Sequence, residues 1–353
     1  MKGREILIEP LGGGGLAAAL RVDGRLEDLL IDPPDSDPMP RPEAIYLAKA
    51  GRPMKGIGGI ILDLGDGASG ILRGGKLPEP GRTLIVQVAN WVEGGKASPL
   101  TDRPLLKGRT AILTPGAPGN NIARSIRDDE RLDALSALAS EAMEGASDNL
   151  GLILRSAAQD ADEAEILGEI SALRADWENV ESKAAQGEPG LLRPAPDSGD
   201  QGWRDWFTPG TTITEGKRAL AEAGLWEDIA GLLRPEASLP GGAFMYIEPT
   251  RALVAVDVNT GRDTSPAATL KANLAAANAL PRQLRLRGLG GQITVDFAPL
   301  PKAERRKIET ALRTALRQDG IDTAISGWTP LGNLELQRKR ARRPLSELKS
   351  QIA

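Results

Sequence analysis

The first hundred residues contain short apolar runs that lack a helical period. Residues 4–10 and 16–32 predict β-strands, joined by a glycine-rich turn, and an Asp-Gly pair within the second run predicts a hairpin. Five prolines then fall within residues 33–42, which predicts a linker. Further β-type runs separated by Gly and Pro follow between residues 44 and 104. Short strands interrupted in this way favour a small β-barrel.

Helical periodicity begins in the middle of the chain. Apolar residues recur every three or four positions over residues 128–144 and 160–186, and a strand is expected between them over residues 151–157. Residues 187–215 are rich in Pro, Gly and Asp, which predicts a loop. A short helix is expected over residues 216–233.

Strands and helices alternate in the last third. Strands are expected at residues 243–248, 251–259, 292–297, 323–328 and 333–338. Ser265 followed by Pro266 predicts the start of a helix, in which Pro281 should produce a kink. A second helix is predicted over residues 302–318 and should end at Gly320. This alternation predicts an α/β or α+β domain.

Composition restricts the chemistry that this chain can perform. The 353 residues include no Cys and no His. The lack of Cys excludes disulfides, thiolate zinc sites, iron–sulfur clusters and cysteine nucleophiles, and the lack of His excludes imidazole bases and His-ligated zinc. Catalysis must therefore use carboxylates, basic side chains, hydroxyls, or a hard metal held by oxygen. Mg²⁺ and Mn²⁺ fit that requirement, and zinc is not expected.

Length and hydrophobicity are those of a soluble globular protein with two or three domains. The composition is 41% hydrophobic and 26% charged. No apolar run approaches the roughly 18 residues of a membrane helix. No long apolar segment follows the N-terminus, so a signal peptide is not expected. We therefore expect a cytoplasmic location.

Charge is unevenly distributed along the chain. From Arg251 onward there are 18 Lys and Arg against 9 Asp and Glu, whereas the first 250 residues have 26 against 39. The basic third indicates either an anionic partner or a solvated face that balances the acidic body. The basic run at residues 337–343 favours phosphate contacts.

Two acidic residues fall late in predicted strands. Alternation places Asp257 and Asn259 on one face of their strand, about 7 Å apart, and Asp296 on the polar face of its strand. A strand, a helix and a strand in succession make the two strands parallel neighbours. Adjacent carboxylates repel one another unless a proton or cation lies between them, so the pair favours a divalent metal. Alternatively, each Asp caps a helix or pairs with an Arg.

The predicted helix between these strands carries Arg282, Arg285 and Arg287. These side chains either bind phosphate or pair with the acidic body.

Residues 251–262 (RALVAVDVNTGR) and 282–297 (RQLRLRGLGGQITVDF) closely resemble the ribonuclease E/G family in motif order and spacing.

Two shorter segments support the same resemblance. Residues 22–29 (VDGRLEDL) are similar to the N-terminal strand of the family, and residues 333–340 (NLELQRKR) to the segment after its last strand. The resemblance is strong over about residues 240–343 and thinner before them.

The resemblance implies an α+β protein of several subdomains. The family arrangement would give a shortened RNase H-like subdomain, an inserted S1-like (OB-type) β-barrel, a 5′-sensor-like region and a DNase I-like α/β catalytic subdomain. These correspond, in that order, to residues 1–38 with 187–235, 39–104, 105–186 and 236–353.

The resemblance also implies an activity. The family cleaves single-stranded RNA endonucleolytically with Mg²⁺, and water attacks the phosphodiester to leave a 5′-phosphate product. By this resemblance Asp257 and Asp296 hold the metal and Asn259 supports them, so all three are expected to be catalytic.

Several basic and polar residues match RNA-contacting positions of the family. Arg155 and Ser156 match an Arg-Thr pair that senses a 5′-monophosphate, although an edge-strand Arg facing solvent is the alternative. Lys96 matches a phosphate-contacting lysine, and Arg124 matches a basic segment of the sensor region. The remaining expected RNA contacts are Arg285, Arg287, Arg338 and Arg340.

The chain also departs from the family pattern. Ile61 and Ile71 occupy the positions at which the family's barrel stacks bases on aromatic rings. Stacking contributes roughly 1–3 kcal/mol per base, so this barrel should bind RNA less tightly. Without Cys, the family's paired-cysteine zinc link is absent, so any oligomer would form by another route.

Three functions are compatible with these features. The first is a compact metal-dependent endoribonuclease, and the second is an RNA-binding relative with weak or no cleavage. The third is a phosphohydrolase that does not act on nucleic acid, which leaves the basic C-terminal run unexplained. The presence of Asp257, Asn259 and Asp296 favours the first, because a binding protein does not need them.

Overall fold

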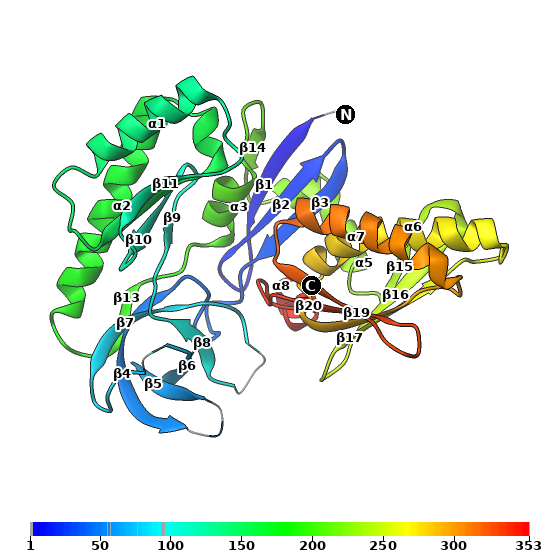
Figure 1. Ribbon diagram of the computed structural model, residues 1–353, viewed down its shortest axis with the longest axis horizontal. Coiled ribbons are helices and arrows are strands. Elements are labelled where there is room, and N and C mark those ends of the chain that lie inside the picture. The colour runs from blue at the N-terminus through cyan, green and yellow to red at the C-terminus, as the bar shows by residue number, and fades with distance from the viewer. Residues whose placement is uncertain (1–2, 55, 57, 76, 93–95, 353) are drawn as a thin grey trace. The chain divides into compact units, whose positions relative to one another are not determined.

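A computed structural model describes residues 3–54, 56, 58–75, 77–92 and 96–352. The chain divides into two compact units (Figure 1). One unit combines Met1–Asp35 with Thr212–Ala353, and the other is Ser36–Thr211. Strands and helices are mixed in both, so the predicted α+β class is confirmed. In the described part of the chain, no helix is long and apolar enough to cross a membrane.

The Ser36–Thr211 unit contains a closed, OB-like barrel, as the sequence predicted. Its five strands pair in the order β4-β5-β6-β8-β7, and β7 pairs back with β4 to close the cylinder. The strands are β4 (Ile45–Met54), β5 (Gly59–Gly65), β6 (Ala68–Arg73), β7 (Thr83–Val88) and β8 (Ser98–Thr101). Aliphatic residues such as Ile60, Leu62 and Val86 fill its interior. Ile61 and Ile71 face each other across β5 and β6.

A second sheet of this unit has two helices packed against it. Its strands are β11 (Gly119–Ile122), β12 (Leu150–Leu154), β10 (Ala111–Pro115) and β9 (Leu106–Lys107), in that spatial order. The helices are α1 (Asp129–Ala142) and α2 (Glu163–Ala184), and both were predicted. Each begins at an aspartate, Asp128 or Asp162, whose carboxylate accepts an N–H of the first turn. A buried stripe on α2, including Ile166 and Ile170, packs into the same core as the sheet.

The prediction of a loop over residues 187–215 is wrong in its details. Strand β13 (Gly190–Arg193) pairs with β4, helix α3 (Ser198–Trp206) begins at the capping Asp197, and β14 (Thr212–Glu215) pairs with β1. Residues 187–211 fall in the Ser36–Thr211 unit. Pro and Gly dominate the local composition, whereas the pairing of β13 depends on a strand about 140 residues earlier.

The other unit begins with a four-stranded sheet. Its order is β14-β1-β2-β3, with β1 (Arg4–Pro10), β2 (Leu16–Val22) and β3 (Arg25–Ile31). The predicted helix over 216–233 is two short helices, α4 (Ala219–Glu222) and α5 (Leu225–Gly231). They are separated by Gly224, which has a φ of 72°, a left-handed conformation that glycine adopts readily. Leu220 and Ile229 pack with Leu7 and Leu26 of the sheet.

A six-stranded sheet forms the rest of this unit. Its strands are, in spatial order, β15 (Glu236–Ser238), β16 (Phe244–Pro249), β17 (Val254–Asn259), β18 (Gly291–Asp296), β20 (Leu334–Arg338) and β19 (Thr323–Trp328). Helix α6 (Pro266–Leu286) connects β17 to β18, which are parallel neighbours as predicted. It remains one element through Pro281. Helix α7 (Arg305–Asp319) follows a short 3₁₀ turn.

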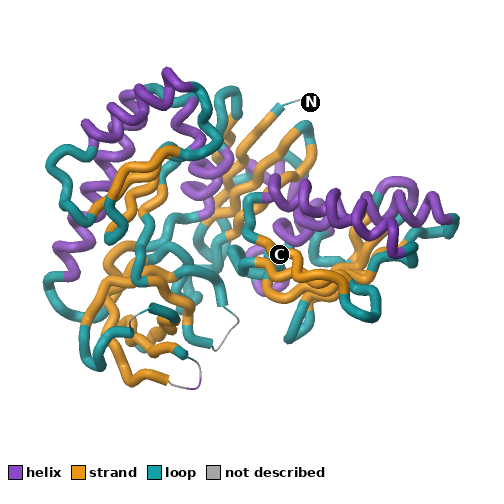
Figure 2. Tube along the Cα trace, viewed as in Figure 1, coloured by secondary structure: helices purple, strands orange, loops and turns teal. Residues whose placement is uncertain are grey.

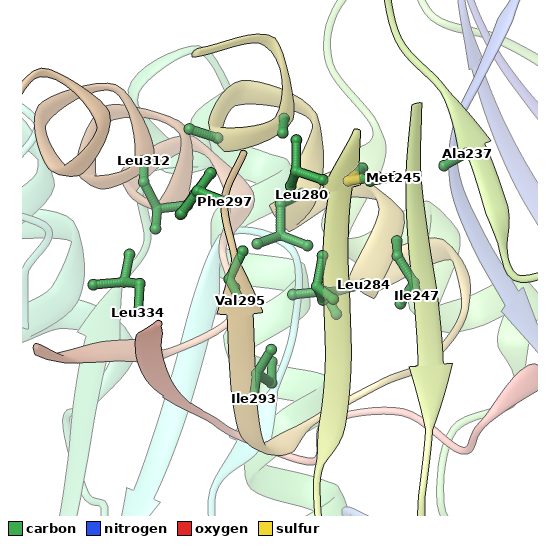
Figure 3. Packing of buried hydrophobic residues seen from close by; sticks show 14 of the residues in the cluster. Ala237, Met245, Ile247, Leu280, Leu284, Ile293, Val295, Phe297, Leu312 and Leu334 are labelled. Carbon is green, nitrogen blue, oxygen red and sulfur yellow. The ribbon is translucent and has the colours of Figure 1, made fainter. Parts of the chain in front are cut away.

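The two helices cover one face of this sheet. Figure 2 shows them running along one side of the strands. In Figure 3, Met245, Ile247 and Val295 point from the strands toward Leu280 and Leu284 of α6. Because neighbouring residues of a strand point to opposite faces, the residues between these positions lie on the other face. That second face carries the acidic residues singled out by the sequence.

Candidate functional site

Strands β17 and β18 bring Asp257 and Asp296 side by side. The two residues are direct partners in the parallel register, and neighbouring strands lie about 4.8 Å apart. Both side chains are exposed, while the valines that alternate with them are buried. The predicted face and the predicted juxtaposition are therefore confirmed. Within the described residues, neither carboxylate has an ion-pair partner, so the alternative of pairing with an Arg is not what the structure has.

Asn259 lies on the same face of β17, two residues further along. Its Nδ2 donates a hydrogen bond of 2.8 Å to Oδ2 of Asp257. This bond fixes the orientation of the Asp257 carboxylate. The cap of helix α6 is Ser265, whose Oγ accepts the N–H of Ala268, so Asp257 does not serve as the helix cap.

The oxygen donors of Asp257, Asp296 and Asn259 fit a hard divalent ion. In the described part of the chain, no group of three or more Asp, Glu, His or Cys side chains converges in a way that could enclose a metal. The protein therefore offers the two carboxylates, with Asn259 beside them, and no closed cage. Mg²⁺ is commonly held by one or two carboxylates together with several waters and substrate phosphates. An exposed pair on an open sheet face meets that description.

The residues expected to sense the 5′ end lie at the ends of two parallel strands. Strands β11 and β12 are in register up to Ile122 and Leu154, so Arg124 and Ser156 follow neighbouring strand ends, and both side chains are exposed. Strand β12 has neighbours on both sides, so Arg155 does not end an edge strand. Arg155 donates to the carbonyl of Gly108 (2.6 Å) and to Oδ1 of Asp205 (3.0 Å).

An acidic pair on other elements stabilises this region. Glu43 contacts Arg204 of α3 (2.8 Å) and Lys107 (2.9 Å), and Asp205 contacts both Arg204 and Arg155. Burial alone would raise the pKa of Glu43, but Arg204 and Lys107 outweigh it and hold the pKa below its ordinary value. Asp205 likewise has a lowered pKa, since Arg204 and Arg155 outweigh its burial. Asp205 therefore stays ionised and orients Arg155.

Comparison with known proteins decides the family. The profile of the ribonuclease E/G family matches residues 105–214 and 211–341. The chain is 30% identical over 312 residues to ribonuclease E of a Nostoc species, and 31% identical over 309 residues to ribonuclease E of Escherichia coli K12. It is 26% identical over 313 residues to ribonuclease G of E. coli K12. This chain belongs to the ribonuclease E/G family.

The matched region is 77% of this chain and 45% of the Nostoc ribonuclease E. It is 76% of this chain and 28% of the E. coli ribonuclease E, and 77% of this chain and 63% of the E. coli ribonuclease G. The chain thus spans less than half the length of the two ribonuclease E proteins. The family profile includes both the Asp257–Asp296 pair and the Arg155 region.

Two of the arginines expected to contact RNA in a ribonuclease E/G member are instead internal. Arg285 and Arg338 are 8% and 1% exposed, and both contact Asp319. Arg285 also contacts Glu27 and Asp28 of β3. The prediction that these guanidinium groups bind phosphate is wrong, because both are buried and form ion pairs with a buried carboxylate. For Arg285, the alternative of pairing with the acidic body is confirmed.

The other two C-terminal arginines differ from one another. Arg287 is 6% exposed and donates to the carbonyl of Arg234 (3.1 Å) and to the side chain of Gln283. Burial, together with the charge of Arg282, lowers the pKa of Arg287 to about 10. The predicted phosphate contact of Arg287 is therefore wrong, because its guanidinium is buried and donates to a backbone carbonyl and an amide side chain. Arg340 is half-buried and lies against Gly291, and Lys96 is exposed, so phosphate contacts by these two stay predictions.

Sequence reasoning missed two aromatic residues at the acidic site. Tyr246 is the direct partner of Asp257 across β16 and β17, and Phe244 is the partner of Asn259. The run of residues 243–248 was recognised as a strand. Its alternation already placed both rings on one face, but the register that puts this face beside Asp257 required the structure.

Proposed function

We propose that this chain is a metal-dependent endoribonuclease that hydrolyses single-stranded RNA and leaves 5′-phosphate products. The observation that carries the proposal is the in-register, exposed pair Asp257 and Asp296, with Asn259 bonded to Asp257, in a member of the ribonuclease E/G family. A bound Mg²⁺ or Mn²⁺ would supply an activated water and stabilise the charge that develops on the phosphate.

The residues of the chain have distinct roles in this proposal. Asp257 and Asp296 would hold the ion from neighbouring strands, and its charge would offset the repulsion between the two carboxylates. Asn259 keeps the Asp257 carboxylate in one orientation. The site lies on the face of the sheet opposite to α6 and α7, which leaves room for a chain substrate to lie across the strands.

Cleavage assays with matched variants test the catalytic proposal. Single-stranded RNA is incubated with Mg²⁺ or with EDTA, and Asp257→Asn and Asp296→Asn are compared with the unaltered chain. Each variant should lose about 100-fold or more in rate, since each removes a ligand of the ion. Glu248→Gln is the control, because Glu248 is exposed on the same sheet but pairs with neither aspartate. Cleavage in EDTA, or full activity in both variants, would refute the proposal.

The 5′-end preference is proposed to reside in Arg124, Arg155 and Ser156. Its support is the position of all three at the ends of β11 and β12, with Arg155 oriented by Asp205. RNA carrying a 5′-monophosphate should be cleaved faster than the same RNA with a 5′-triphosphate. Arg155→Gln and Ser156→Ala should reduce that ratio without changing cleavage of the triphosphorylated RNA. Equal rates on both RNAs in the unaltered chain would refute the sensor.

A second candidate function is RNA binding with weak cleavage. It is favoured by the aliphatic pair Ile61 and Ile71 on the barrel, which offers no aromatic ring to a base. If this function is the correct one, RNA binding persists while the Mg²⁺-dependent turnover rate stays close to that of Asp257→Asn. The cleavage assay described above separates the two functions directly.

A further inference from the structure

Two aromatic rings lie beside the aspartate pair on strand β16. Phe244 and Tyr246 alternate with Met245 and Ile247, which are buried in the core under α6. The rings therefore point to the opposite face of the sheet. The antiparallel register places Tyr246 directly opposite Asp257. The side chains of Tyr246, Asp257 and Asp296 thus form one row across three neighbouring strands.

The geometry of the rings suits a contact with a flat ligand. Their centroids are 5.4 Å apart and their planes make an angle of 76°, so one ring meets the other edge to face. Both are half-buried, which means that each is held in place and still has accessible surface. Directly opposite residues in an antiparallel pair have Cβ atoms about 4.5–5.5 Å apart. Tyr246 is accordingly one strand spacing from Asp257.

Core packing does not account for these two aromatic residues. The chain has only 3 Phe and 2 Tyr, and one of each lies on this face of the sheet. The buried core under α6, shown in part in Figure 3, includes Phe297 but neither of these two rings. On the barrel, Ile61 and Ile71 provide no ring to a base. A surface for stacking is therefore present next to the acidic pair.

We propose that Tyr246 and Phe244 form a base-stacking platform that positions an unpaired nucleobase of the RNA beside the phosphodiester to be cleaved. The inference rests on the proposed function, because it takes the Asp257–Asp296 pair as the cleavage site. Tyr246 stacks on the base, and Phe244 supports the Tyr246 ring from its side. Every nucleobase has a π-face, so the platform accepts any sequence of single-stranded RNA.

The two residues act as positioning residues. A stacked base is bound equally in the ground state and in the transition state, so loss of the ring should raise KM and leave kcat nearly unchanged. Tyr246→Leu should raise KM by about 5- to 150-fold, which is the range for one stacked base. Tyr246→Phe keeps the ring and should stay within about twofold of the unaltered chain. A purely structural role would instead lower the urea midpoint of unfolding in Tyr246→Leu.

A thermodynamic cycle that combines protein variants with RNA variants provides the decisive test. RNA oligonucleotides with a single abasic nucleotide at successive positions around the cleaved bond are compared with intact RNA, using the unaltered chain, Tyr246→Leu and Phe244→Leu. At one position next to the bond, the abasic nucleotide should raise KM for the unaltered chain and cause no further rise for Tyr246→Leu. Effects that simply add at every position would overturn the inference.

The same cycle is measured as equilibrium binding by fluorescence anisotropy in EDTA, where metal-dependent cleavage is prevented. If the unaltered chain does not cleave RNA, the proposed function is refuted. The binding measurements alone then show whether Tyr246 stacks on a base. Cleavage with additive effects in both assays refutes only the platform. If Tyr246→Leu does not fold, Phe244→Leu with the abasic series takes its place.

Discussion

Replacement of the buried Asp319 by asparagine should destabilise the six-stranded sheet. Asp319 ends helix α7, and its side chain is 1% exposed. Its Oδ2 lies 2.6 Å from Nη2 of Arg338, whose side chain is 0% exposed, and its Oδ1 contacts Arg285. Among the described residues, Asp319 is the one acid paired with Arg338, which otherwise donates to Thr323 Oγ1 (2.9 Å). Burial lowers the pKa of Arg338, and Asp319 opposes that change.

The size of the effect follows from which charge loses its partner. Arg285 keeps Glu27 (2.7 Å) and Asp28 (3.3 Å) when Asp319 is replaced. Arg338 keeps no acid, and a buried charge left without its partner costs about 3–5 kcal/mol of unfolding free energy. Asp319→Asn should therefore lose about that amount. Adding Arg338→Met removes the uncompensated charge, so the double variant should recover much of the loss.

Urea unfolding combined with amide hydrogen exchange measures this prediction. Urea is uncharged and does not screen ion pairs, and exchange in α7 and β20 assigns the loss to this part of the chain. Asp322→Asn is the matched control, because Asp322 is exposed three residues away and its change should stay within about 0.5 kcal/mol. A loss below about 1 kcal/mol in Asp319→Asn, or a double variant no more stable than the single one, would refute the reasoning.

Three further predictions use other features of the structure. Because the pKa of Glu43 is lowered, its ion pair with Arg204 stabilises the Ser36–Thr211 unit above about pH 4.5. This stabilisation is lost as the pH falls through the lowered pKa, so the urea unfolding curves of the unaltered chain and of Glu43→Gln should converge in acid. Asp162→Ala removes the N-cap of α2 and should cost about 1 kcal/mol in urea unfolding. Lys96→Gln should reduce the slope of log affinity for RNA against log salt by about 0.7, whereas Arg338→Met should leave that slope unchanged.

Local patterns predicted the elements whose stability is decided locally. The helices α1 and α2 have a capping aspartate and a regular apolar stripe, and both were expected from the sequence. The β17-α6-β18 unit followed from alternation and from the handed connection between parallel strands. By contrast, β13 and α3 lie in a segment rich in Pro and Gly. Their formation depends on pairing with β4 and on ion pairs with Glu43, which no local pattern contains.

The same distinction explains which site residues could be predicted. Asp257 and Asp296 lie on the exposed face of their strands, and strand periodicity determines that face whatever packs elsewhere. Whether Arg285 meets phosphate or a carboxylate depends on Glu27, which is 258 residues away in the sequence. Charge counts along the chain cannot distinguish these outcomes, since both need a positive side chain. Burial separates them, and burial is a property of the assembled sheets.

The two faces of the six-stranded sheet perform different tasks, and this division makes the acidic pair tolerable before any ligand binds. On the helix-covered face, a carboxylate would have to be desolvated, at a cost of several kcal/mol. On the open face, water solvates Asp257 and Asp296, so their mutual repulsion is screened while the site is empty of substrate. In the proposed function, a cation and an RNA phosphate would replace that water. The register of β16 brings Tyr246 to the same face, so the proposed binding and cleavage would occur on one face of the sheet.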